Sequence, residues 1–207
     1  MKKVLLVLFI MAFAANMMFA GTPMTNQGDK YLGFTMGGLG DFNLHSAGPV
    51  NGVSARYFLS KDMSLRLGLG FSNSKSEPTT GTFSKNESMS FGIAPALVWN
   101  MAPVAGSISP YWGVQASYIN TKLTDTYRAN GTKDELSVNT FGAGVMMGAE
   151  WFAWDGISFN AEYSFTYNSA SGDFTPAGGT SQDLGTATSM GFNTSAQVGL
   201  NVYIGGN

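Results

Sequence analysis

Apolar and small polar residues alternate along most of the chain that follows residue 29. In Ile157–Asn168, the odd-numbered positions hold Ile, Phe, Ala and Tyr, while the even-numbered positions hold Ser, Asn, Glu and Thr. The same alternation runs through Met63–Ser72 and through the C-terminal segment Gln197–Ile204. A period of two residues predicts β-strands that have one apolar face and one polar face.

Eight segments follow this pattern, which predicts an antiparallel sheet of eight strands. Many of the segments reach about 10 residues, the length that a tilted strand needs to cross a bilayer. The expected strands lie at residues 30–39, 53–59, 63–72, 88–99, 107–119, 138–152 and 157–168 and in the C-terminal segment that ends at Ile204.

The connections between these segments alternate in length. The three short ones are Ser60–Asp62, Met101–Gly106 and Ala153–Gly156. The four longer ones, rich in Ser, Thr, Gly and Asn, are Gly40–Gly52, Asn73–Asn86, Asn120–Leu136 and Ser169–Met190. Short periplasmic turns and long outer loops are typical of barrels in the bacterial outer membrane.

The apolar face of these strands is expected to point outward, toward lipid. A soluble barrel of the lipocalin kind also alternates, but with its apolar face inside. Here the polar face carries few charges, and its small residues suit the crowded interior of an eight-stranded barrel. Aromatic residues near the strand ends predict two girdles at the bilayer interfaces, formed by Tyr57, Trp99 and Trp151 and by Phe71, Tyr118 and Tyr167. The predicted fold is therefore an all-β, eight-stranded antiparallel up-and-down transmembrane β-barrel.

The N-terminus has the features of an export signal. Lys2 and Lys3 precede the apolar run Val4–Ala15, which is too short to span a bilayer. Cleavage is expected after Ala20, with cleavage after Ala14 as the alternative. The expected organisation is a cleaved signal peptide, a short N-terminal segment and a transmembrane barrel, at residues 1–20, 21–29 and 30–205.

The composition excludes several classes of function. Charged residues make up 12% of the chain, about half the usual fraction in soluble domains. There is no cysteine, so disulfides and thiolate metal sites are excluded. A formal net charge of −2 gives no basic surface of the kind that binds nucleic acid.

The end of the chain resembles the assembly signal of small outer-membrane barrels. Its pattern of polar, Gly and spaced hydrophobic residues is formed by Gln197, Gly199, Val202 and Ile204. With the eight alternating segments, this pattern makes the chain similar to the barrels of the OmpA transmembrane-domain and OmpX type. The resemblance implies insertion by the barrel assembly machinery. The chain departs from the family pattern by lacking a terminal Phe or Trp and by adding Gly205-Gly206-Asn207.

Four charged residues are expected to point into the lumen: Arg56, Arg66, Glu150 and Glu162. Isolated buried charges are costly, so we expect the arginines to meet the glutamates across the interior. Together with other residues of the polar face, namely Tyr111, Gln115, Gln197, Asn201 and Tyr203, this network is expected to plug the barrel. A gate that opens when the charged pairs exchange partners is the alternative.

The sequence contains no set of residues arranged for catalysis, for a cofactor or for a metal. The one histidine, His45, lies in the first long connection, and its neighbour Ser46 does not complete a triad.

We expect a structural and surface-interaction role, with a narrow channel for ions or small solutes as the alternative. A lipid-modifying enzyme has the least support. The expected partners are outer-membrane lipid or lipopolysaccharide, the barrel assembly machinery and a surface ligand bound by the long loops. The oligomeric state is left open.

Overall fold

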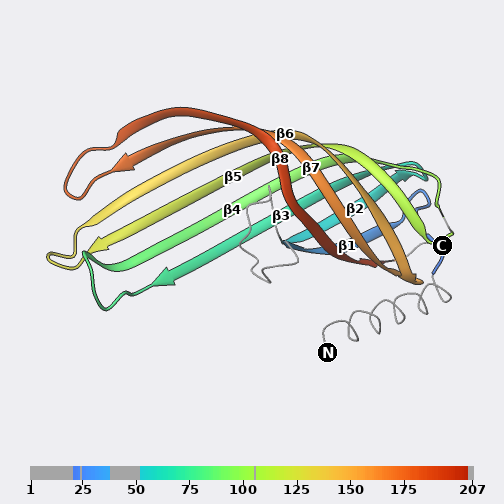
Figure 1. Ribbon diagram of the computed structural model, residues 1–207, viewed down its shortest axis with the longest axis horizontal. Coiled ribbons are helices and arrows are strands. Elements are labelled where there is room, and N and C mark those ends of the chain that lie inside the picture. The colour runs from blue at the N-terminus through green and yellow to red at the C-terminus, as the bar shows by residue number, and fades with distance from the viewer. Residues whose placement is uncertain (1–20, 24, 38–51, 105, 205–207) are drawn as a thin grey trace, which may run out of the picture.

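The computed structural model describes residues 21–23, 25–37, 52–104 and 106–204, and it shows a closed antiparallel β-barrel (Figure 1). Each strand is hydrogen-bonded to the next in sequence order, and the last is bonded to the first. The eight strands of the described residues are β1 (Lys30–Gly37), β2 (Val53–Ser60), β3 (Met63–Ser76), β4 (Phe83–Asn100), β5 (Ile108–Tyr127), β6 (Lys133–Trp154), β7 (Ile157–Thr175) and β8 (Gln182–Tyr203). An isolated antiparallel bridge pairs Val104 with Ile108 in the connection between β4 and β5. The predicted eight-stranded up-and-down barrel is confirmed.

Some predicted features lie outside the described residues. These are the signal peptide at 1–20, most of the first long connection, which includes His45, and the barrel's predicted end at residue 205. Among the residues that the structure describes, no helix has the length and apolar character needed to span a bilayer.

Three of the predicted long loops are mostly strand, which corrects the expected boundaries. Much of Asn73–Asn86, Asn120–Leu136 and Ser169–Met190 is paired, and the three turns shrink to residues 77–82, 128–132 and 176–181. These segments lack the apolar alternation because neither of their faces has to meet lipid. Their strands are held by backbone pairing and by cross-strand pairs such as Leu123 with Leu136. In Figure 1 the three hairpins project together beyond the closed part of the barrel.

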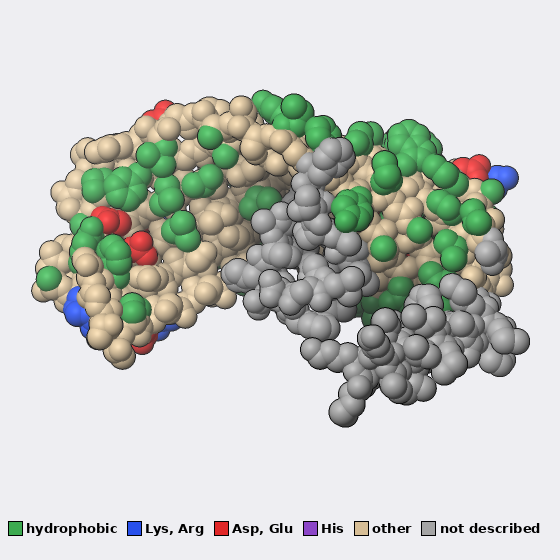
Figure 2. Space-filling model, viewed as in Figure 1, with side chains coloured by type: hydrophobic (Ala, Val, Ile, Leu, Met, Phe, Trp, Pro, Cys, Tyr) green, Lys and Arg blue, Asp and Glu red, His purple; other side chains and the backbone are tan. Residues whose placement is uncertain are grey.

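The barrel wall has polar side chains inside and apolar side chains outside. On β3, Leu65, Leu67 and Leu69 are 40–50% exposed, whereas Ser64 between them and the turn is fully buried. On the face shown in Figure 2, the visible charged side chains lie toward the hairpin end and at the opposite end of the molecule. A polar interior enclosed by an apolar outer surface is the reverse of the arrangement in a water-soluble protein, and it is the arrangement of a membrane barrel.

Two small apolar clusters lie within the lumen. Four aromatic rings, those of Tyr31, Phe58, Phe152 and Tyr203, occupy the end near the short turns. The second cluster, further along the barrel, contains Ala96, Val98, Tyr111 and Met146. The charged residues of the lumen lie among these two groups, so they are shielded from water.

Candidate functional site

Arg56 on β2 and Glu150 on β6 form an ion pair across the lumen. The Arg56 Nη1 atom lies 3.2 Å from Glu150 Oε2, and both side chains are 2% exposed. The same guanidinium donates from Nε to Ser64 Oγ at 2.6 Å and from Nη2 to Asn100 Oδ1 at 2.5 Å. A buried arginine needs both a counter-charge and hydrogen-bond acceptors, and here it has both.

The other carboxylate oxygen of Glu150 is the acceptor for three further groups. Asn201 Nδ2 donates to Oε1 at 2.8 Å and the Tyr203 hydroxyl donates to it at 2.9 Å. The Ser158 hydroxyl also donates to this atom. Strands β2, β6, β7 and β8 thus meet at one carboxylate, which fixes its position in the lumen.

A second ion pair joins Arg66 on β3 to Glu162 on β7. The Arg66 Nη1 and Nη2 atoms lie 2.6 Å from Glu162 Oε2 and 3.1 Å from Oε1, so the pair is bidentate. Tyr111 donates its hydroxyl to Glu162 Oε2 at 3.0 Å and accepts a bond from Asn160 Nδ2 at 3.2 Å. The four charges expected in the lumen therefore lie in two neutral pairs, each between strands on facing sides of the ring.

Aromatic rings surround the Arg56 guanidinium. Its central carbon lies 4.7 Å from the Phe58 ring centroid, 5.6 Å from that of Tyr31 and 5.7 Å from that of Tyr111. Cation–π attraction of this kind strengthens when the groups are desolvated. Sequence reasoning did not single out Phe58 and Phe152, although each lies two residues from a lumen charge and so shares its face.

The described residues of the N-terminal segment, 21–23 and 25–29, lie at the end of the lumen near the short turns. Gly21 N donates to Phe152 O at 3.1 Å, at the end of β6. Gly28 N donates to Phe58 O at 2.9 Å, and Phe58 N donates to Asp29 O at 3.0 Å, at the end of β2. Since β2 and β6 lie on facing sides of the ring, the segment is tied to both sides of the mouth. The sequence had indicated only a short segment without a role.

The described residues contain no group of three or more His, Asp or Glu side chains that could hold a metal ion. The chemistry of the lumen is that of fixed charge pairs and hydrogen bonds.

A family model described as "Outer membrane protein beta-barrel domain" matches residues 5–203. The chain belongs to this family. A search of curated proteins found no match. Membership of the outer membrane protein beta-barrel domain family assigns the chain to the bacterial outer membrane, so the exposed apolar surface of the barrel faces lipid.

As in other barrels of outer membranes, aromatic residues occur at both ends of the lipid-facing wall of this family member. Near the short turns, Tyr57 is 43% exposed, and Trp99 stacks on Trp112 with ring centroids 4.5 Å apart. Trp151, in the same region, stacks on Phe159 at 5.9 Å.

Nearer the hairpins, Phe71 and Tyr167 are 65% and 48% exposed. Tyr118 packs against Phe141 at 4.9 Å and donates its hydroxyl to Asn139 Oδ1 at 2.8 Å. Above this level the outward positions of β5 and β6 become polar or charged, as in the ion pair between Lys122 and Glu135. The six aromatic residues therefore lie where the two girdles were expected, and their function as interfacial anchors stays a prediction.

The residues of the predicted assembly signal lie on the last strand and just after it. Val202 and Ile204 are 37% and 53% exposed on the outer face, while Gly199 is buried. A Cβ atom at Gly199 would overlap the side-chain amide of Asn160, so a larger residue at this position would displace Asn160. The backbone of Gln197 pairs with β1 and β7, and its side chain lies outside the described residues. Recognition of this strand by the family's assembly machinery stays a prediction.

Proposed function

We propose that this outer-membrane β-barrel protein is a closed barrel with a structural and surface-interaction role. Its lumen is plugged by polar and charged side chains, and its projecting hairpins are available for binding. The chain is exported through the periplasm with loss of residues 1–20, and it has no enzymatic activity and needs no cofactor. Its partners are outer-membrane lipid or lipopolysaccharide, the barrel assembly machinery and a surface ligand held by the hairpins.

The observation that carries the closed state is the charge network of the lumen. Arg56 and Glu150 are each 2% exposed, and the Arg66–Glu162 pair adjoins the Tyr111 hydroxyl. An ion passing through would have to separate buried charges that are already paired, which is costly. The network therefore favours a plug over a narrow channel.

Contacts between hairpin tips support the surface-interaction role. Arg128, at the β5–β6 tip, donates to Gly81 O at 3.2 Å and to Phe83 O at 3.1 Å, and also to Pro78 O. At the next tip, Ala177 N donates to Asp134 Oδ1 at 2.7 Å. The three tips are thus connected to their neighbours, and a preorganised surface loses less entropy on binding than independent loops do.

The experiment that tests the plug is planar-bilayer conductance of the refolded barrel. Wild type is expected to be silent, and the double variant Glu150→Ala/Glu162→Ala is expected to conduct. The control variant Glu87→Ala/Glu135→Ala removes the same charge from the hairpins and should stay silent. Steady conductance by wild type would contradict the plug and favour the channel.

A further inference from the structure

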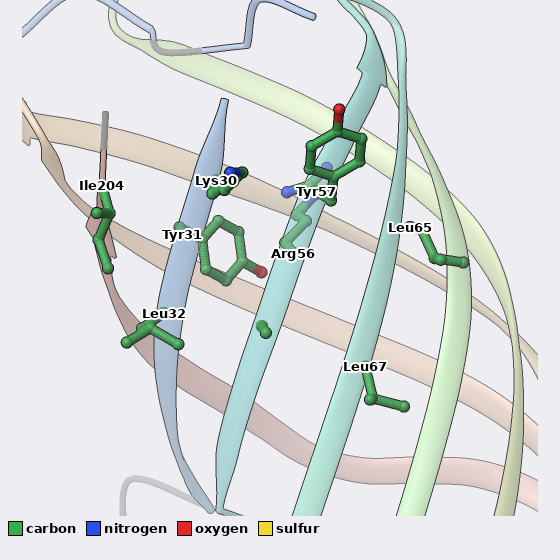
Figure 3. A pocket seen from close by; sticks show the side chains of 9 residues that line it. Lys30, Tyr31, Leu32, Arg56, Tyr57, Leu65, Leu67 and Ile204 are labelled. Carbon is green, nitrogen blue, oxygen red and sulfur yellow. The ribbon is translucent and has the colours of Figure 1, made fainter. Parts of the chain in front are cut away.

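A groove lies on the lipid-facing surface of the barrel, across β1, β2 and β3 and beside Ile204, which follows β8, with a volume of about 380 Å³ (Figure 3). This volume is at the lower end of the range for small-molecule sites. Figure 3 shows Lys30 and Tyr57 toward one end of the groove and Leu32 and Leu67 toward the other.

Ala55 on β2 is the cause of the groove. In the register of the sheet, Ala55 lies between Leu32 on β1 and Leu67 on β3, and all three side chains face outward. The next outward position on β2, toward the short turn, is Tyr57. A methyl group among these larger side chains leaves a hollow whose walls are apolar.

Lys30 lies at the end of the groove nearest the short turns. It is exposed, and its Nζ atom lies 6.0 Å from the centroid of the Tyr57 ring. No ion pair recorded among the described residues involves Lys30. The adjacent Asp29 is 2% exposed and accepts a hydrogen bond from Asn26 N, so it faces away from the groove. An ammonium group beside hydrocarbon favours an anionic partner that can reach it.

We propose that the groove binds one anionic glycerophospholipid of the leaflet at the short-turn end, which in outer-membrane barrels is the periplasmic leaflet. An acyl chain lies over Ala55 between Leu32 and Leu67, and the phosphate pairs with Lys30. A water-soluble ligand does not suit a site within the lipid-facing wall. A second copy of the chain could also cover the leucines, and the test below distinguishes this outcome by its mass. The proposal rests on the membrane location and not on the plug or the hairpins.

The test is native mass spectrometry of the barrel released from nanodiscs that contain phosphatidylglycerol and phosphatidylcholine in equal amounts. Wild type is expected to retain one phosphatidylglycerol molecule in preference to phosphatidylcholine, by about fivefold. This ratio corresponds to about 1 kcal/mol, the contribution of one lysine near an anionic lipid surface.

Two variants separate the headgroup from the acyl chain. Lys30→Gln should reduce the preference to about one, and Lys61→Gln, in the nearby β2–β3 turn, is the control for loss of charge. Ala55→Leu should reduce the retention of both lipids by filling the groove. Ala116→Leu, an outward alanine on β5, is the control for added bulk. All four positions are exposed. The difference in electrophoretic mobility between unheated and heated samples checks that each barrel has folded.

Three results would overturn the proposal. The first is wild type with no preference for phosphatidylglycerol, which would mean that Lys30 merely extends toward the aqueous interface. The second is unchanged lipid retention in both Lys30→Gln and Ala55→Leu. The third is a dimer mass that Ala55→Leu abolishes, which would make the groove an interface between two copies.

Discussion

Glu150 joins four strands inside the lumen of this barrel. One of its carboxylate oxygens accepts from Arg56, and the other accepts from groups on two further strands. The ion pair with Arg56 measures 3.2 Å between Nη1 and Oε2. Asn201 and Tyr203 approach the other oxygen at 2.8 and 2.9 Å. Loss of this carboxylate would remove the counter-charge of a buried arginine and the acceptor of three donors, the third being the Ser158 hydroxyl, while the aromatic rings around Arg56 would still exclude water.

Glu150→Ala should therefore lower the free energy of unfolding by about 3–5 kcal/mol, the cost of breaking a buried ion pair on one side. Urea unfolding in lipid vesicles, followed by tryptophan fluorescence, measures this change. Glu87→Ala, which breaks the more exposed pair with Lys85, is the control and should cost about 0–1 kcal/mol. A loss at Glu150 as small as that of the control would show that Arg56 finds other partners or water.

Gly148→Ala should destabilise the barrel by about 1–3 kcal/mol through overpacking. A Cβ atom at Gly148 would lie 2.5 Å from Ala161 O and 2.6 Å from the ring of Tyr111. Because Tyr111 donates to Glu162, the displacement would also disturb the second ion pair.

The matched control is Gly68→Ala, where the added atom would make ordinary contacts at 3.6 and 3.7 Å with Ala94. Its cost should be close to zero in the same urea experiment. Equal effects of the two substitutions would mean that both the Tyr111 ring and the Ala161 carbonyl move aside without cost.

Arg128→Ala should loosen the contact between the β3–β4 and β5–β6 tips. The guanidinium binds three backbone carbonyls of the neighbouring hairpin, and the substitution leaves the tips held by the backbone bond from Arg128 N to Thr82 O. Faster amide exchange in residues 77–82 is expected, measured by hydrogen exchange with mass spectrometry. Lys133→Ala on the same hairpin is the control, and unaltered exchange in Arg128→Ala would show that the tips are independent of this side chain.

The β5–β6 hairpin should lose stability in acid. The pKa of Glu135 is held below its usual value, mainly by the hydrogen bond from Lys122 and secondly by the positive charge of Lys122. A carboxylate with a lowered pKa in the folded state stabilises that state above its unfolded-state pKa of about 4.3. The stabilisation is lost as the pH falls through the folded-state pKa. As the pH falls through the folded-state pKa of Glu135, amide exchange near Lys122 should accelerate in wild type, after correction for the intrinsic pH dependence of exchange. Glu135→Gln should remove this acceleration.

The membrane-embedded part of the barrel could be predicted from the sequence because lipid imposes an alternation on it. The period of two residues placed Arg56 and Glu150 on the inner face, and the order of the strands placed them on facing sides of the ring. Pairing between individual residues could not be derived, because the stagger of the strands decides which charges reach each other. Phe58 and Phe152 were missed because only tyrosines, whose hydroxyls can join a polar network, were expected among the aromatic residues of the lumen.

The hairpin extensions could not be predicted from alternation. Residues such as Leu123 and Leu136 pair across β5 and β6 in a region where both faces of the sheet are outside the apolar belt. Segments of Ser, Thr and Asn in such a region have the composition of loops, although their backbones continue the sheet. The role of residues 21–29 also escaped prediction, since it depends on backbone bonds to Phe58 and Phe152 that leave no pattern in the sequence.

The unequal lengths of the strands have a consequence for how the barrel forms. β7 and β8 pair from Ile157 to Phe174 along a local hairpin, whereas β1 pairs with β8 only over Tyr31–Gly37. The seam joins residues from opposite ends of the chain, so its closure carries the largest loss of chain entropy, and it gains far fewer paired residues than the long hairpin of β7 and β8. Sheet closure at β1 and β8 should then be the slow final event of folding, after the hairpins from β3 to β8 have formed.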